Sequence, residues 1–225
     1  MHRLARKSEG ILQMKKIKAI IFDMDGVLID AKDWHYEALN KALGLFGMEI
    51  DRYDHLVTYD GYPTQKKLDL LSMECGLPVE LQQFLNELKQ QYTMEIVEMK
   101  CKPKFQHEYA LSKLKQEGYR LAVCSNSIRS SIETMLRRAS IDGYFDFCLS
   151  NQDVKKPKPD PEMYSKAIRR LNLSPGECLV VEDNEKGVKA ALASGAHLLK
   201  VVTVEDVNYQ NIKARISELE GAKHA

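Results

Sequence analysis

The sequence predicts an α/β fold, a doubly wound parallel sheet core with an inserted α-helical cap domain. Two observations indicate this class. Short apolar runs rich in β-branched residues alternate with helical patterns from about residue 101 onward, which is typical of a parallel sheet covered by helices on both faces. Residues 31–100 contain helical patterns and no convincing strand. We therefore expect residues 17–30 and 101–225 to form the core and residues 31–100 to form the cap.

The elements before residue 101 follow from the spacing of their apolar residues. Residues 17–22 (IKAIIF) are expected to form a short buried strand, because the run is apolar and β-branched. Residues 33–46 are expected to form a helix, since apolar side chains recur every three or four positions and Asp33 can cap its first turn. Two further cap helices are expected over residues 64–76 and 78–99.

Glycine and proline mark the ends of several core elements. Gly118 follows the end of a helix, and Pro161 suits the first turn of another. In chain order, the expected elements are a helix over 105–116, a strand over 120–124, a helix over 128–139, a strand over 145–149, a helix from Pro161, a strand over 179–181, a helix over 186–194 and a strand over 197–202.

The composition is that of an ordinary globular protein, with 225 residues, 44% hydrophobic and 29% charged, and a net charge of +1. The balanced charge argues against nucleic acid and membranes as partners, and no apolar run approaches the roughly 18 residues of a membrane-spanning helix. The basic first sixteen residues lack the apolar core of a secretory signal, so we expect a flexible extension over residues 1–16. Five cysteines without a C-x-x-C pair favour a cytoplasmic location without a zinc site or disulfide framework. We expect a monomer.

Polar residues follow the predicted strands where these strands end. They are Asp23, Asp25 and Gly26 after the first strand, Ser125 and Asn126 after the second, Lys156 in a later loop, and Glu182 and Asp183 after another strand. Ligands of open parallel sheets bind just beyond the carboxyl ends of the strands. We therefore expect these segments to face a single crevice.

Four of these residues are carboxylates, which repel one another unless a counter-charge is present. Like charges about 4 Å apart repel by roughly 1–4 kcal/mol per pair, so the cluster requires a cation or bound protons. Cysteine and paired histidine ligands are absent from these segments, and an all-oxygen site suits Mg²⁺. The expected metal ligands are Asp23, Asp25, Glu182 and Asp183.

The same segments contain the groups that phosphoryl transfer requires. Asp23 is the expected nucleophile, since an ionised carboxylate can attack phosphorus directly. Asp25 is the expected acid and base, which protonates the leaving alkoxide and then activates water. The groups expected to meet the phosphate of a small phosphate ester are Lys156, which also acts in catalysis, Ser125, and turn amides near Gly26 and Asn126.

Each motif taken alone has a simpler explanation. An Asp-x-Asp at the end of a strand is often a turn or a cap, and Ser125-Asn126 alone would be a helix cap. A single lysine such as Lys156 is ordinarily solvated, and Glu182-Asp183 alone would be a loop pair. The order of the segments, each at the end of a predicted strand, favours one shared site.

These segments resemble the haloacid dehalogenase superfamily. The resemblance lies in IIFDMDGVL at 20–28, AVCSN at 122–126, KPKPDP at 156–161 and VVEDN at 180–184. It implies a Rossmann-like core with a helical cap, Mg²⁺ as cofactor and an aspartyl-phosphate on Asp23. It also implies that Asp25 gives the metal its backbone oxygen, that Lys156 is the family's lysine, and that Lys158 is the variable residue between two prolines. The dehalogenases of the superfamily lack a residue equivalent to Asp25, so the resemblance excludes them.

Within the superfamily, the chain resembles β-phosphoglucomutase and small sugar-phosphate or phosphoglycolate phosphatases. The segment DGVLIDAKDWH brings His35 to the position of a mutase histidine that contacts the acid–base aspartate. Trp34 and Tyr62 are candidates for an apolar wall of the substrate pocket, although Trp34 fits the core of the cap equally well. Thr64 lies in the corresponding cap segment, Gly61-Tyr62-Pro63-Thr64.

That cap segment lacks the arginine with which the mutase holds a second phosphate. Lys66, Lys67 and Lys89 are possible substitutes, but solvated helix positions are commoner for such lysines. We therefore favour a phosphatase over a phosphohexomutase. A third hypothesis, a non-catalytic sensor phosphorylated on an aspartate, is disfavoured by Asp25 and by the helical insertion, because an adjacent acid–base group would shorten the life of the acyl phosphate.

Overall fold

The computed structural model describes residues 16–221 of the chain. The flexible extension expected over residues 1–16 lies outside the described residues, except for Lys16. The ammonium of Lys16 donates a hydrogen bond to the carbonyl oxygen of Leu219 in the last helix.

Within residues 16–221, five parallel strands form one sheet. They are β1 (Ala19–Phe22), β2 (Arg120–Cys124), β3 (Phe147–Leu149), β4 (Cys178–Glu182) and β5 (His197–Lys200). Their order is β3-β2-β1-β4-β5, and every neighbouring pair is parallel. The chain therefore winds outward from β1 first to one edge and then to the other, which confirms the doubly wound fold.

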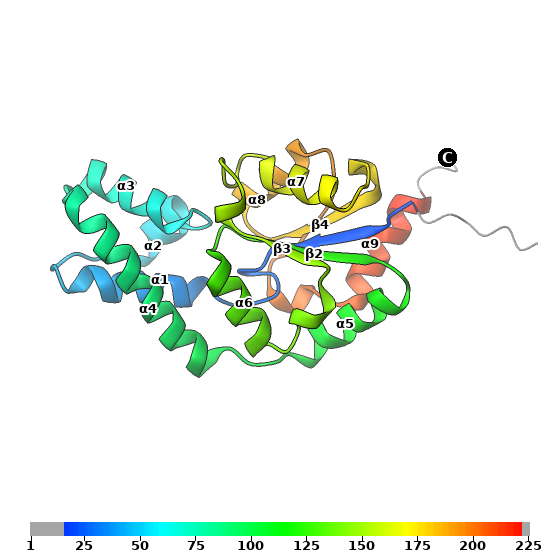
Figure 1. Ribbon diagram of the computed structural model, residues 1–225, viewed down its shortest axis with the longest axis horizontal. Helices are drawn as coiled ribbons and strands as arrows, with labels where there is room; N and C mark the ends of the chain where they lie inside the picture. The colour runs from blue at the N-terminus through cyan, green and yellow to red at the C-terminus, as the bar shows by residue number, and fades with distance from the viewer. Residues whose placement is uncertain (1–15, 222–225) are drawn as a thin grey trace, which may run out of the picture.

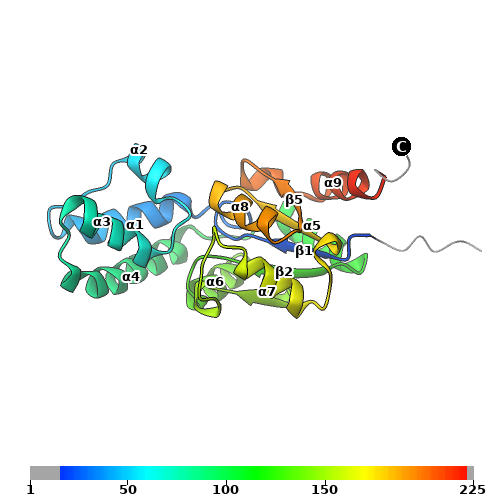
Figure 2. The same ribbon diagram turned by 90° about the horizontal axis from the view of Figure 1, so that it is seen from above.

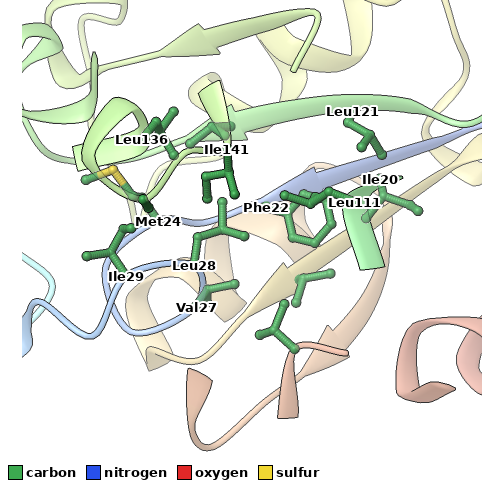
Figure 3. Packing of buried hydrophobic residues seen from close by; sticks show 14 of the residues in the cluster. Ile20, Phe22, Met24, Val27, Leu28, Ile29, Leu111, Leu121, Leu136 and Ile141 are labelled. Carbon is green, nitrogen blue, oxygen red and sulfur yellow. The ribbon is translucent and has the colours of Figure 1, made fainter. Parts of the chain in front are cut away.

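The sheet is buried on both faces because strand side chains alternate between them. Ile20 and Phe22 of β1 belong to one hydrophobic cluster, part of which is drawn in Figure 3. Ala19 and Ile21 belong to a second cluster on the opposite face. The helices that pack on the first face are α5 (Phe105–Gln116), α6 (Arg129–Arg138) and α9 (Tyr209–Gly221), and those on the second are α7 (Glu162–Arg170) and α8 (Glu185–Ala193).

The cap helices lie together to one side of this core, as Figures 1 and 2 show. They are α1 (Lys32–Gly44), α2 (Arg52–Asp54), the π-helix η1 (His55–Tyr59), α3 (Thr64–Cys75) and α4 (Gln82–Lys100). Leu39, Leu68 and Leu85 meet in a hydrophobic cluster of the cap itself. Ala31 and Val97 pack in the core instead, so both ends of the inserted segment are anchored on the core. We keep residues 31–100 as the proposed extent of the cap.

The sequence prediction and the structure differ at several helices. Asp33 does not cap α1: the helix begins at Lys32, and Asp33 lies in its first turn and pairs with Arg52 at 2.5 Å. The sequence pattern also missed α2, η1 and α9; the buried face of α9 consists of Ile212 and Ile216. Short 3₁₀ helices cover Val79–Leu81, Asp142–Tyr144, Asn151–Asp153, Pro175–Glu177 and Val204–Asp206. Among the helices of residues 16–221, none is both long enough and apolar enough to span a bilayer.

Candidate active site

The carboxyl ends of β1, β2 and β4 bring polar segments from distant parts of the chain together. The three strands are in register, with Phe22 opposite both Val123 and Val181. Asp23, the first residue after β1, therefore lies level with Cys124 and Glu182, the last residues of β2 and β4, and Ser125 follows Cys124. Asp23 and Ser125 line a cavity of about 130 Å³ whose opposite wall comes from the cap.

Asp23, Glu182 and Asp183 form an acidic cluster at this end of the sheet. One carboxylate oxygen from each residue lies within 4.8 Å of the other two. Burial raises the pKa of Asp23 against the opposing charge of Lys158, and the neighbouring carboxylates raise it further. A cation bound among these oxygens would relieve their repulsion and favour their ionised forms.

The residues of the acidic cluster fit a divalent metal ion. Asp183 Oδ1 is buried and has no hydrogen-bond partner within residues 16–221. The other oxygen, Oδ2, pairs with the ammonium of Lys32, so this carboxylate already accommodates a cation. Gly26 adopts a φ of 91°, and a Cβ at this position would overlap Asp183 Oδ2. A set of carboxylate oxygens with one oxygen left unpaired suits Mg²⁺.

The buried cation of the cluster is Lys158, and the prediction of Lys156 in this role is wrong. The Lys158 ammonium donates to Asp23 Oδ1 at 2.6 Å, to Glu182 Oε1 at 2.7 Å and to a backbone carbonyl at 2.8 Å. Burial would lower the pKa of Lys158, but the two carboxylates hold it above its ordinary value. The Lys156 side chain is 75% exposed, and its ammonium lies 4.0 Å from Asp160, outside the cavity.

A repeated sequence pattern explains this error. The segments 156–159 and 158–161 both have the form K-P-x-P. The second copy leads directly into α7, whose Tyr164 hydroxyl donates to Glu182 at 2.7 Å and whose ring lies 4.7 Å from the Lys158 ammonium. The distance from each lysine to the start of this helix is the signal that could have selected Lys158.

Asp25 lies outside the acidic cluster and has partners of its own. Its Oδ1 lies 3.0 Å from His35 Nε2, and its Oδ2 accepts hydrogen bonds from Ser125 at 3.1 Å and from Ser127 at 2.8 Å. Burial would raise the pKa of Asp25, but His35 and the two hydroxyls lower it to about 2. Because these partners occupy the Asp25 side chain, the contact expected between Asp25 and the metal would come from its backbone oxygen. The sequence analysis did not single out Ser127.

His35 is held between Asp25 and Lys89 of α4. Lys89 Nζ lies 3.1 Å from His35 Nδ1, on the side of the ring away from Asp25. Burial lowers the pKa of His35, and the charge of Lys89 lowers it further against the effect of Asp25. Burial also lowers the pKa of Lys89 to about 7. A neutral imidazole fits this arrangement, because it donates from Nε2 to Asp25 and accepts at Nδ1 from Lys89.

Two groups expected to bind phosphate have other partners. The backbone amide of Gly26 donates to the carbonyl of Ile29 at 2.7 Å and is not free to meet phosphate, whereas the contact of the other turn amides near Gly26 with phosphate stays a prediction. The side-chain amide of Asn126 donates to the carbonyls of Gly61 at 2.9 Å and of Lys158 at 3.1 Å. The backbone amide of Asn126 has no acceptor within the described part of the chain, and its contact with phosphate stays a prediction.

The cap supplies the second wall of the cavity. Tyr62 and Thr64 line it, where substrate-facing residues were expected. Trp34 does not: it lines a separate cavity beside the two linkers between core and cap, and it packs against the core cluster. Lys67 and Lys89 also line the active-site cavity and are buried, contrary to the solvated positions expected for them.

The loop before α3 is fastened to the core beside this site. Asp60 Oδ2 accepts a hydrogen bond from the Asn184 side chain at 2.7 Å, and the Asp60 carbonyl accepts one from Lys186. The Lys186 ammonium also lies 4.0 Å from the centre of the Tyr62 ring. These contacts link the loop of the cap to the core beside the cavity.

The doubly wound sheet, the helical cap and the acidic cluster at the strand ends together indicate a hydrolase with an α/β core. The chain belongs to the family described as haloacid dehalogenase-like hydrolases, whose sequence pattern matches residues 20–201. This membership confirms the resemblance found in the four sequence motifs.

Two phosphatases and one solved structure are each similar to most of the chain. A "Phosphorylated carbohydrates phosphatase" of Thermotoga maritima is 31% identical over 182 residues, which are 80% of this chain and 82% of that protein. A "Phosphoglycolate phosphatase" of Aquifex aeolicus is 27% identical over 179 residues, which are 80% of this chain and 82% of that protein. The crystal structure of a β-phosphoglucomutase from Clostridium difficile matches with a TM-score of 0.79 at 23% identity, over 90% of this chain and 98% of that chain. This last likeness shows the fold alone.

Proposed function

We propose that the protein is a Mg²⁺-dependent phosphatase that hydrolyses a small phosphomonoester, such as a sugar phosphate, through an aspartyl-phosphate on Asp23. As a member of this hydrolase family with phosphatases among its relatives, it is a phosphoric monoester hydrolase. One observation carries the proposal. Asp23 belongs to the acidic cluster, whereas Asp25, two residues later, is held outside it by His35 and two serine hydroxyls. This separation supports different roles for the two aspartates.

Asp23 acts as the nucleophile of the first half-reaction. One of its oxygens bonds to phosphorus while the bond between phosphorus and the ester oxygen breaks. The Lys158 ammonium supports the ionised form of Asp23 that this attack requires. When bound, Mg²⁺ supplies positive charge to the phosphate oxygens from a site made by Asp23, Asp183 and the backbone oxygen of Asp25, with Glu182 in support.

Asp25 carries the proton between the two half-reactions. It first gives a proton to the leaving oxygen, and it then takes one from the water that attacks the aspartyl-phosphate. The ionised Asp25 of this structure is the form needed for the second half-reaction. Approach of the negatively charged phosphate raises the pKa of Asp25 and so favours the protonated form needed for the first.

The phosphate oxygens are held by groups that surround Asp23. We assign this role to the Ser125 hydroxyl, the backbone amide of Asn126 and the Lys158 ammonium, which replaces Lys156 in the proposal. Ser125 now donates to Asp25 at 3.1 Å, so it must turn toward the phosphate when substrate binds.

Release of inorganic phosphate from a panel of sugar phosphates and phosphoglycolate, with Mg²⁺ present, tests the proposal. The variant Asp23→Asn should lose roughly 10³-fold or more of the wild-type rate, because it removes the nucleophile. Asp33→Asn is the matched control, since the Asp33 side chain is 66% exposed in the cap. No turnover by folded wild-type protein with bound Mg²⁺, or full activity of Asp23→Asn, would overturn the proposal. Conversion of a sugar 1-phosphate to the 6-phosphate, without net release of phosphate, would indicate a mutase instead.

We also propose that the enzyme is a cytoplasmic monomer. All five cysteines, which lie between residues 75 and 178, are free, as suits a reducing compartment. The cavity is lined by residues of one chain, so the proposed reaction requires no second copy.

A further inference from the structure

Lys67 of α3 has no partner in a cavity where the other lysines have one. Its side chain lines the same cavity as Asp23, and the residue is only 6% exposed. Within residues 16–221, no hydrogen bond or ion pair engages the Lys67 ammonium. Lys32 pairs with Asp183, Lys158 pairs with Asp23, and Lys89 contacts His35. The Lys67 ammonium is therefore available to a group that enters the cavity.

The charges of Asp60 and Asp25 favour the ammonium form of Lys67, but within residues 16–221 neither carboxylate forms an ion pair with it. The acidic residue that the cap contributes to the cavity is Asp60, and its carboxylate already accepts a hydrogen bond from Asn184. Burial lowers the pKa of Lys67 to about 8, with Asp60 and Asp25 limiting the fall, so the ammonium form still predominates at pH 7. The amine of Lys89, whose pKa burial lowers to about 7, lies in the same wall. Burying an ammonium without an ion-pair partner costs free energy, and an anionic group that enters the cavity would offset that cost.

Lys67 lies on the side of the cavity where the leaving group must lie. Its position on α3 belongs to the cap, whereas the groups assigned to the transferred phosphate belong to the core. Its charge also interacts with Asp25, the residue assigned to the leaving oxygen. An anionic group on the leaving alcohol would therefore meet Lys67 while the ester phosphate meets Asp23 and Lys158.

We propose that the enzyme's substrates are small phosphomonoesters whose leaving alcohol carries a second anionic group, a carboxylate or a phosphate, and that Lys67 binds this group. The proposal rests on the phosphatase activity proposed above. Because an ammonium attracts both kinds of anion, the chemistry of Lys67 alone does not separate carboxylate from phosphate.

Matched pairs of esters that differ in one charge test this proposal. One pair is 2-phosphoglycolate and 2-hydroxyethyl phosphate, and the other is propane-1,3-diol bisphosphate and 3-hydroxypropyl phosphate. The kcat/KM of the wild-type enzyme should be higher for the charged member of at least one pair by roughly tenfold or more, since the neutral member leaves Lys67 unpaired. The pair with the larger preference identifies the second group as carboxylate or phosphate.

The variant Lys67→Met should abolish this preference. For the charged ester, the kcat/KM of Lys67→Met should fall to about the value for the neutral ester. Lys67→Arg should retain part of the preference. Lys66→Met is the matched control, because Lys66 is the exposed neighbour on the same helix; it should keep the full preference. Thermal unfolding of each variant shows whether the fold is retained.

A binding experiment separates this proposal from the proposed function. Calorimetric titration of the same esters into Asp23→Asn with Mg²⁺ measures affinity without turnover. If no ester is hydrolysed, the proposed function fails. The role of Lys67 is still supported in that case if Asp23→Asn binds a charged ester more tightly than its neutral partner and if adding Lys67→Met to Asp23→Asn abolishes this difference. If wild-type enzyme hydrolyses both members of each pair equally well, or if Lys67→Met keeps the preference, the proposed function stands and the role of Lys67 is overturned.

Discussion

Lys158 donates three hydrogen bonds inside the acidic cluster, two of them to carboxylates. Lys158→Met should therefore leave Asp23 and Glu182 buried without their counter-charge and lower the free energy of unfolding by roughly 3–5 kcal/mol. It should also abolish phosphate release. Lys156→Met, at an exposed position in the same loop, should change stability by no more than about 0.5 kcal/mol. Urea unfolding and phosphate assays measure both effects, and equal behaviour of the two variants would contradict the assignment of Lys158.

The same two lysines show what residue patterns do and do not predict. The aspartates at the end of β1 and the acidic pair after β4 were found because strand ends have strong sequence signals. The choice between Lys156 and Lys158 depends on how the loop enters α7, which a repeated K-P-x-P pattern leaves open. The hydrogen bond that engages the Gly26 amide could not be predicted, because its acceptor, the Ile29 carbonyl, is defined only by the folded turn.

At the scale of single elements, the loop before α3 forms hydrogen bonds between the cap and the core beside the cavity. Gly61 has a φ of 75°, and a Cβ there would overlap the Asn184 side chain. Gly61→Ala should displace this loop and raise KM by roughly tenfold, since misplaced binding groups weaken the closed state. Gly47→Ala is a matched control, because Gly47 has a φ of 70° but open space around its Cβ position. Equal KM values for the two variants would show that the closing contact is unimportant.

The π-helix η1 should make the stability of the cap depend on pH. His55 is buried against the Tyr36 ring, neither of its ring nitrogens has a hydrogen-bond partner within residues 16–221, and burial lowers its pKa to about 4. The unfolded chain binds a proton near pH 6.5 and the folded chain only near pH 4. As the pH falls from 6.5 to 4, the free energy of unfolding of the wild type should therefore fall by about 2–3 kcal/mol relative to that of His55→Phe.

Chemical unfolding of the two proteins at pH 7, 6, 5 and 4 measures this difference. A constant difference in the free energy of unfolding across this range would show that the His55 ring is hydrated or hydrogen-bonded in solution.

Predictability from sequence also varied among the elements. The strands of the sheet were placed to within a few residues, since continuous apolar runs are specific to buried parallel strands. Helix α2 and η1 were missed because they are short and expose most of their side chains. The buried positions of Lys67 and Lys89 were missed as well, because a lysine on a helix has the same sequence signal whether it faces solvent or a cavity.

At the scale of the whole molecule, metal binding should stabilise the fold. Mg²⁺ at 100 times its Kd should add about 2.7 kcal/mol to the free energy of unfolding, because the unfolded chain lacks the assembled carboxylates. Asp183→Asn should abolish this gain, since it removes a carboxylate that has one unpaired oxygen. Thermal unfolding with and without Mg²⁺, and with a chelator, measures the effect. A Mg²⁺-dependent shift of the same size in Asp183→Asn would locate the metal elsewhere.

The turn after β1 has a wider consequence. Its hydrogen bonds, from Gly26 to Ile29 and from Leu28 and Ile29 back to Met24, lie within the core and hold the backbone of the turn, whereas the Asp25 side chain is also held from the cap by His35. Lys67 reaches the same cavity from α3, which belongs to the cap. An exchange of the cap would therefore leave the backbone of this turn in place, but the new cap would also have to supply a partner for Asp25 in the position of His35.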